Sequence, residues 1–311
     1  MSSRGLRTMA KQGWHRGFRL LQRFGVNVLP AHYYSCVPDL RDLAQRVDWR
    51  RPRSMYGIAG RSVGDQVALL GEWVLPQADL LSAERLYQDA ISGGGGDGGY
   101  GEIEALVLAC FVATTKPRRI IQIGCGVSTA VIRAAAVKAG HAIEIVCVEP
   151  YPSVWLRQAA ARDEVRLVAA PAQSVDTAVL CDLGEGDLLF IDSTHAVKPG
   201  SEVNYLIHEV LPRLPAGAWV HFHDIYFPYD YPRDALEGDL LFPQESTLLY
   251  AFLTGNARFR LELSLSMVHY AEPEALKQLI PAYDPASQKD GLTVGRGGHF
   301  PSAAWLRASG S

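Results

Sequence analysis

Four side chains that can bind a cation or move a proton follow two apolar segments of this chain. Asp192 and His195 come after one segment, and His223 and Asp224 come directly after the other. The first, residues 188–191, is uninterrupted, as is typical of strands that a parallel sheet buries on both faces, and the second, residues 218–222, contains His221. Because the carboxyl ends of parallel strands meet at the ligand-binding edge of an open sheet, we expect the four side chains to converge there.

The types of these side chains indicate two kinds of chemistry. Asp192, His223 and Asp224 offer two carboxylates and an imidazole, a set that suits Mg²⁺, Mn²⁺ or Fe²⁺ better than a structural zinc ion. His195, with Asp192 nearby, can act as the catalytic base on a substrate hydroxyl, since an imidazole titrates near neutral pH. The structural alternative is that His195 caps the following helix and Asp192 only orders its loop.

A second group of residues can hold a nucleotide-like cofactor. The β-branched run at residues 119–123 ends in Gly124-Cys125-Gly126, and an alanine-rich helical pattern follows. This pattern indicates a buried strand that enters a tight loop and then a helix. Glycine at these two positions lets the main chain turn sharply and approach a ligand closely, because no Cβ is in the way.

The next strand pattern narrows the choice of cofactor. Residues 143–149 form a β-rich run that ends in Glu149, and an acid at this point can accept hydrogen bonds from ribose hydroxyls. The dinucleotide pattern requires a third small residue after the two glycines, and this chain has Thr129 there. A cofactor with a ribose and no phosphates fits better, and S-adenosyl-L-methionine is the obvious candidate.

Together these motifs resemble those of the class I S-adenosylmethionine-dependent methyltransferases, in particular the small-molecule group known as methyltransferase domain 24. The resemblance runs from about Tyr100 onward and rests on residues 121–129, 148–150, 188–195 and 220–225. It implies a Rossmann-like α/β fold with a seven-stranded sheet that is mostly parallel and has an antiparallel last strand. It also implies a small-molecule acceptor of the natural-product type.

The resemblance implies roles for particular residues. The family usually has an acid where this chain has Gln122; an amide can still bond the cofactor or the loop, so we expect altered affinity rather than loss of binding. In metal-dependent members of the superfamily, one acid follows the fourth strand and an acidic or amide pair follows the fifth. His223 departs from that layout, which would shift the preference to a softer metal or mean that no metal binds. The residues expected to contact the cofactor are Tyr100, Gln122, Gly124, Gly126, Ser128, Glu149, Gln173 and Asp192.

Along its length the chain divides into three parts. Residues 1–91 indicate a helical cap or substrate-lid region, residues 92–99 a glycine-rich linker, and residues 100–311 the cofactor-binding domain. The first 24 residues predict an amphipathic basic helix, which we expect to pack on its own domain or on a partner subunit rather than on a membrane surface. The aromatic segment at residues 226–232 predicts a wall of the substrate pocket.

Composition limits the classes of protein that remain. The chain has 311 residues and a formal net charge of −3, so its overall charge does not favour nucleic acid. Its five cysteines show no C-x-x-C spacing, which indicates free thiols and a reducing, cytoplasmic location. No apolar run reaches the roughly 18–20 residues that a membrane span needs. Homo-oligomerisation through the N-terminal region stays open.

The sequence therefore predicts an enzyme that transfers a methyl group from S-adenosyl-L-methionine to a small molecule. We expect O-methylation of a hydroxyl, assisted by a divalent cation and by His195 as base. Two alternatives remain: a metal-independent methyltransferase that acts on carbon or nitrogen, and a catalytically inactive cofactor-binding partner subunit. Gln122 slightly favours the inactive alternative, whereas the four side chains at the sheet edge count against it.

Overall fold

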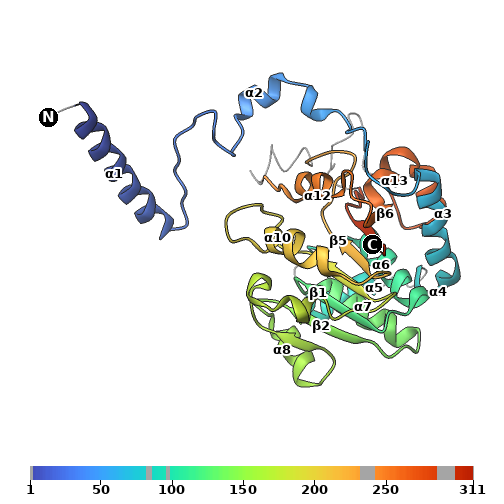
Figure 1. Cartoon of the computed structure of the whole chain (residues 1–311). Helices are drawn as coiled ribbons and strands as arrows, with labels where there is room; N and C mark the ends of the chain where they lie inside the picture. The colour runs from blue at the N-terminus through green and yellow to red at the C-terminus, as the bar shows by residue number, and fades with distance from the viewer. Residues whose placement is uncertain (1–2, 82–85, 96–98, 232–241, 286–297, 311) are drawn as a thin grey trace. The chain divides into compact units, whose positions relative to one another are not determined.

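A seven-stranded sheet lies at the centre of residues 47–311 (Figure 1). The computed structural model describes residues 3–81, 86–95, 99–231, 242–285 and 298–310, and within them the strand order is β3-β2-β1-β4-β5-β7-β6. The strands are Arg119–Ile123 (β1), Glu144–Val148 (β2), Arg166–Val168 (β3), Leu188–Ile191 (β4), Trp219–Phe222 (β5), Phe259–Ser264 (β6) and Ala304–Ala308 (β7).

The direction of the strands confirms the predicted Rossmann-like fold. β1 to β5 pair in parallel, while β7 lies between β5 and β6 and runs antiparallel to both. β1 has β2 on one side and β4 on the other, so the strand order reverses at β1. In open α/β sheets this reversal is where a crevice opens at the carboxyl ends of the strands.

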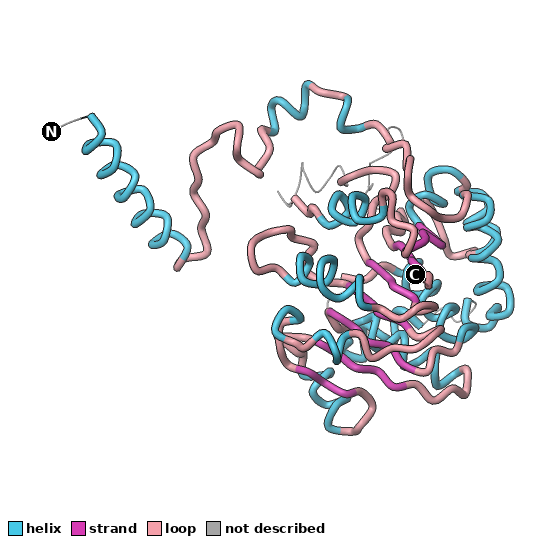
Figure 2. The backbone as a smooth tube through the Cα atoms, in the orientation of Figure 1, coloured by secondary structure: helices cyan, strands magenta, loops and turns pink. Residues whose placement is uncertain are grey.

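Helices lie on both faces of the sheet (Figure 2). They are α3 (Val63–Val74), α4 (Ala78–Leu81), α5 (Leu86–Ala90), α6 (Glu102–Thr115), α7 (Val127–Lys138), α8 (Val154–Ala161), α9 (Thr177–Leu180), α10 (Glu202–Tyr205), α12 (Glu245–Leu253), α13 (Leu265–Ala271) and α14 (Pro273–Leu279). Within the predicted linker, residues 92–95 continue a short helical segment, Ile91–Gly95, and residues 96–98 lie outside the described residues.

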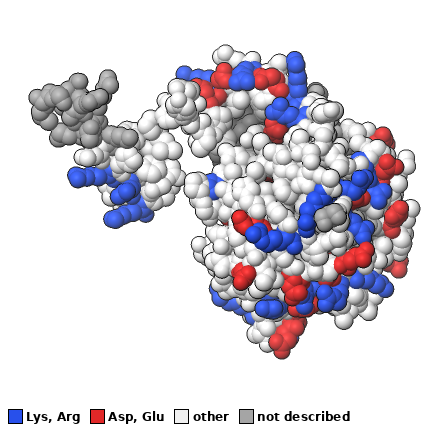
Figure 3. Space-filling model, viewed as in Figure 1, with Lys and Arg blue, Asp and Glu red and all other residues white. Residues whose placement is uncertain are grey.

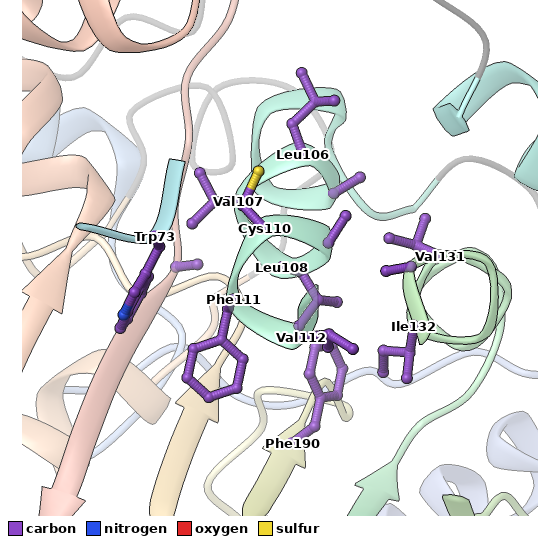
Figure 4. Packing of buried hydrophobic residues seen from close by; sticks show 14 of the residues in the cluster. Trp73, Leu106, Val107, Leu108, Cys110, Phe111, Val112, Val131, Ile132 and Phe190 are labelled. Atoms are coloured by element: carbon purple, nitrogen blue, oxygen red, sulfur yellow. The ribbon is translucent and has the colours of Figure 1, made fainter. Parts of the chain in front are cut away.

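Helix α6 is buried along almost its whole length (Figure 4). Its side chains are apolar on every side, as expected for a helix with no solvent-facing stripe. Phe111 meets Trp73 of α3 edge to face, with ring centroids 5.0 Å apart, and Phe190 of β4 belongs to the same apolar cluster. These contacts hold α6 firmly against the sheet.

Residues 1–46 form a second compact unit, which contains α1 (Ser3–Gln22) and α2 (Leu40–Gln45). Residues 47–91 belong to the same unit as the sheet. A role of residues 1–91 as a cap over the substrate stays a prediction. None of the described helices is both long enough and apolar enough to cross a membrane.

Candidate active site

The glycine loop after β1 rests directly on the backbone that follows β4. Gly124 has a φ of +79°, and a Cβ built there would lie 1.7 Å from the carbonyl oxygen of Asp192. The Asp192 N–H in turn donates to the carbonyl of Ile123, 2.9 Å away. A side chain at position 124 would therefore be strained by its backbone and would push the loop away from Asp192.

Gln122 lies behind this loop and not in the hollow in front of it. The side chain is fully buried; its amide nitrogen donates to Ser128 Oγ at 2.7 Å, and its amide oxygen accepts from Thr129 Oγ1 at 2.9 Å. Thr129 Oγ1 also accepts from the N–H of Gly126, at the start of α7. The amide thus holds the loop against its helix, and direct contact of Gln122 with a cofactor stays a prediction.

Glu149 stands at the carboxyl end of β2, as predicted. One carboxylate oxygen accepts from the N–H of Tyr151 at 2.8 Å, and the other accepts from the N–H of Cys125 in the glycine loop at 3.3 Å. These two bonds fix the direction of the carboxylate. Because each oxygen can accept more than one hydrogen bond, both retain capacity for the hydroxyls of a ribose.

Two adjoining hollows lie along this edge, and Gly124, Glu149 and Asp192 line both of them. The first has a volume of about 320 Å³ and is also lined by Tyr100, Gly126 and Ser128. The second has a volume of about 380 Å³ and includes Gln173, whose amide donates to the carbonyl of Gly200 at 3.1 Å. Together they have the size range of small-ligand sites. Every residue predicted to contact the cofactor, except Gln122, lines at least one of the two hollows.

The predicted catalytic side chains meet where β4 and β5 end. Asp192 Oδ1 lies 3.6 Å from His195 Nε2 and 3.4 Å from His223 Nδ1. These three side chains place their ligand atoms within 4.8 Å of one another, which is close enough to surround one metal ion. Asp224 is slightly farther away, with a carboxylate oxygen 3.8 Å from each imidazole, and its Oδ1 accepts from the hydroxyl of Ser302 at 2.8 Å.

His195 is held from two directions. Its Nδ1 lies 2.7 Å from Glu245 Oε2, and its carbonyl accepts from the N–H of Gln244, so both its ring and its backbone are tied to the start of α12. His195 and Asp224 both have a left-handed backbone, with φ values of +55° and +53°. Such conformations are uncommon for non-glycine residues and cluster at functional sites. Because Glu245 holds Nδ1, Nε2 is the nitrogen of His195 that faces Asp192.

The charges at this edge stabilise one another. Burial disfavours the ionised Asp192, but the imidazoles of His223 and His195 outweigh it and hold the pKa of this carboxyl below its ordinary value. Burial also disfavours charged imidazoles, yet Asp192 and Glu245 raise the pKa of His195 well above its ordinary value. For His223, burial is outweighed by Asp224 and Asp192, which raise the pKa to about 9. The carboxylates therefore favour the protonated forms of both imidazoles, and a metal ion bound there would compete with the proton.

Three polar residues of this site, Glu245, Ser302 and Glu104, were not identified from the sequence. Glu245 is buried and holds His195. Ser302 donates its hydroxyl to Asp224 and its backbone N–H to Glu104 Oε1, at 2.9 Å. An acid at the first position of an otherwise apolar helix was a usable signal for Glu245. Nothing near Ser302 in the sequence marks it.

Tyr100 and the aromatic segment border the same edge. The Tyr100 ring is 4.7 Å from the ring of His223, and its hydroxyl lies 3.2 Å from His221 Nε2. Tyr226 stacks on Phe300 with ring centroids 6.2 Å apart. Of the predicted wall at residues 226–232, Pro232 lies outside the described residues.

Residues 121–225 match the model of a family described as a methyltransferase domain. This segment is therefore similar to a methyltransferase domain. The methyltransferase domain so defined runs from β1 to the end of β5 and contains both the glycine loop and the side chains that follow β4 and β5.

Individual relatives of the methyltransferase are distant. An uncharacterised protein of Archaeoglobus fulgidus is 25% identical over 173 residues, which cover 52% of this chain and 76% of that protein. A solved O-methyltransferase of Bacillus cereus is 14% identical, with 80% of this chain and all of that chain covered and a TM-score of 0.43. One from Streptomyces achromogenes, involved in tomaymycin synthesis, is 15% identical, with 75% and 90% covered and a TM-score of 0.42.

Proposed function

We propose that this methyltransferase methylates a hydroxyl of a small-molecule acceptor and that His195 takes the hydroxyl proton. One observation carries the proposal: Nδ1 of His195 is held by Glu245, while Nε2 faces Asp192 at the edge that also lines the cofactor hollows. A base needs its working nitrogen free and its ring fixed in direction. Glu245 fixes the ring of His195, and Nε2 can accept the hydroxyl proton once His195 has lost its own.

The donor would lie in the two hollows. Glu149 would accept hydrogen bonds from its ribose hydroxyls, the loop at Gly124 would allow close approach of the main chain, and Gln173 would lie at the adenine end. S-adenosyl-L-methionine supplies a methyl group activated by its sulfonium, so the protein has to align donor and acceptor and remove a proton. The support for this placement is that Glu149 and Asp192 line both hollows.

The donor set also fits a divalent cation. His223 Nδ1 is buried and makes no well-formed hydrogen bond with any described residue, although Asp192 Oδ1 lies 3.4 Å away. Mixed carboxylate and imidazole ligands suit Mn²⁺ or Fe²⁺, and Mg²⁺ where oxygens dominate. A cation there would lower the pKa of an acceptor hydroxyl and would weaken the hold of Asp192 on the proton of His195.

Two ligand sets are open, and they differ in the role of His195. The set predicted from the sequence is Asp192, His223 and Asp224, which leaves His195 free as base. The set with the shortest mutual distances replaces Asp224 by His195. In that set His195 has no nitrogen left for a proton, because Glu245 occupies the other one.

Calorimetric titration of Mn²⁺ into the purified chain and its variants separates these sets. Asp192→Ala should abolish binding in both. Loss in Asp224→Ala with binding kept in His195→Ala supports the predicted set, and the opposite result supports the second set. Asp163→Ala, an exposed carboxylate on another part of the surface, is the control. If no variant or parent binds Mn²⁺, the metal-independent reaction takes precedence.

The reaction itself is tested by release of S-adenosylhomocysteine with a panel of hydroxylated aromatic acceptors. His195→Gln should lower turnover by about 10²- to 10⁴-fold, the usual contribution of a general base, while leaving the affinity for S-adenosylhomocysteine unchanged. If His195→Gln retains full turnover, the base is another group. Binding of S-adenosylhomocysteine without turnover on any acceptor would favour the inactive cofactor-binding subunit.

Three finer points belong to the same proposal. An acceptor of the natural-product type, with an aromatic ring, would suit the stacked rings of Tyr226 and Phe300. A cytoplasmic location would suit the free thiols. Assembly of copies through the N-terminal region stays a prediction, to be checked by light scattering.

A further inference from the structure

The N-terminal helix α1 has two chemically different faces. Trp14, Phe18 and Leu21 are spaced four and three residues apart, so they share one side of the helix. Arg16 and Arg19 lie on the opposite side. Trp14 and Leu21 are exposed and Phe18 is half-buried, while both arginines are exposed. The helix thus presents an apolar stripe that its own unit leaves open.

The charge of this segment is opposite to that of the rest of the chain. Residues 1–38 contain six Lys or Arg and no Asp or Glu, a net charge of +6. The remaining residues contain 24 Lys or Arg and 33 Asp or Glu, a net charge of −9. In Figure 3 the described atoms of α1 include blue side chains and no red ones. Such an asymmetry between parts of a chain is typical of segments that meet an anionic surface.

The helix also needs a surface to be stable. Gly13 and Gly17 lie in its interior, and a Cβ at either position would meet no other atom within 4 Å. Interior glycines weaken a helix in water, and most of the stability of a helix in a protein comes from packing of its apolar face. Burial of the stripe is therefore part of what keeps α1 helical.

We propose that α1 docks in the plane of a membrane surface that contains anionic lipids. The apolar stripe would sit at the boundary of headgroups and acyl chains, where Trp and Phe side chains are favoured. The arginines on the other face would extend their guanidinium groups to the lipid phosphates. The helix lies on the surface and does not cross it, in agreement with the absence of a spanning helix among the described residues.

Other occupants account for less of this pattern. A second copy of α1 would bring two wholly cationic segments together, whereas paired helices normally match opposite charges across their flanks. A nucleic acid would satisfy the arginines but would leave Trp14, Phe18 and Leu21 in water. An anionic bilayer satisfies both faces at once. The proposal does not depend on the reaction at the sheet edge.

The experiment is co-sedimentation of the full-length chain with large unilamellar vesicles of phosphatidylcholine, either alone or with about one-third phosphatidylglycerol. The chain should pellet with the anionic vesicles and stay in solution with the neutral ones. Binding should weaken as salt is raised, because exposed charges are screened. Phe18→Ser combined with Leu21→Ser should abolish binding.

A matched pair of variants tests the charge. Arg19→Ala with Arg23→Ala should weaken binding to anionic vesicles by about 25-fold, since each arginine near such a surface contributes about fivefold. Arg157→Ala with Arg166→Ala removes the same charge from exposed positions of the methyltransferase unit and should change nothing. Vesicle binding that is absent, or equal with neutral lipid, overturns the proposal. So does binding that both pairs weaken equally.

Light scattering of the same proteins measures their oligomeric state and so tests the alternative that α1 binds a second copy of the chain. If the full-length chain is a stable oligomer that Phe18→Ser with Leu21→Ser converts to monomers, and vesicles do not compete with that oligomer, then α1 is a contact between copies and the membrane proposal is wrong. If the oligomeric state is unchanged and only vesicle binding is lost, the proposal stands.

Discussion

Replacing Glu245 by Gln should weaken the hold on the His195 proton while keeping the shape of the side chain. Glu245 is buried, and its Oε2 lies 2.7 Å from His195 Nδ1, so the bond is short and charge-assisted. Hydrogen bonds to charged groups contribute about 1.5–3 kcal/mol. The proton affinity of His195 should therefore fall by about 10- to 100-fold in Glu245→Gln, since 1.4 kcal/mol is a factor of ten.

The assay is NMR titration of the histidine ring carbons in labelled protein, with a chelator present and His195 assigned through His195→Asn. Glu202→Gln is the matched control. Glu202 accepts hydrogen bonds from the backbone and the hydroxyl of Thr194, at 2.9 and 2.6 Å, and so supports the same loop through a different residue. The pKa of His195 should fall in Glu245→Gln and stay unchanged in Glu202→Gln.

The sign of the effect on turnover follows from the role of a base. A base works when it is deprotonated, so the rate should rise with pH through the pKa of His195. Glu245 helps to raise that pKa; in Glu245→Gln the rise should therefore occur at lower pH, with a lower maximum. An unchanged pKa of His195 in Glu245→Gln, or an equal fall in Glu202→Gln, would refute the idea that Glu245 orients and charges this imidazole.

Three further predictions concern the donor side and the stability of the site. Glu149→Gln should lower the affinity for S-adenosylhomocysteine by about 10- to 100-fold in calorimetry, because a charge-assisted bond contributes about 1.5–3 kcal/mol. Glu144→Gln, at the other end of β2, should leave that affinity unchanged. Gly124→Ala should reduce both that affinity and the melting temperature, since its Cβ would overlap the carbonyl of Asp192; unchanged values would mean that the loop can move aside. In chelator, the free energy of unfolding should fall as pH rises. The pKa of His223 is raised to about 9 in the folded protein. Its stabilising contribution to the free energy of unfolding is therefore complete below its unfolded pKa of about 6.5 and is lost as the pH rises to about 9, a change of about 3 kcal/mol. Denaturant titrations should show a smaller fall in His223→Asn than in the parent chain, because His195 retains its own contribution.

The sequence predicts the sheet and its ligand-binding edge well because both follow from local patterns. A buried parallel strand needs an uninterrupted apolar run, and the residue after it must lie at the carboxyl edge. This reasoning predicts that Asp192 and His223 lie close together although they are distant in the chain. In the structure, Asp192 Oδ1 lies 3.4 Å from His223 Nδ1. It also placed Glu149 beside the glycine loop.

The rest of the site depends on how distant parts dock. Glu245 reaches His195 because α12 packs with its first turn against the loop after β4, and no spacing in the sequence encodes that contact. Ser302 reaches Asp224 through the turn before β7. Gln122 was expected to bond either the cofactor or the loop, and its amide bonds Ser128 and Thr129. Side-chain directions of this kind are decided by tertiary packing rather than by residue type.

The position of β7 has a consequence for how the protein is made. β7 is the last of the described strands, yet it lies between β5 and β6, and Ser302 lies two residues before its first residue. Chains emerge from the ribosome with their N-terminal part first, so the strands that surround the donor hollows can assemble while β5 still has an open edge. A nascent chain can therefore acquire its donor site before its acceptor edge is complete. Completion of the acceptor edge waits for residues 302–308, so incomplete chains do not carry a finished site.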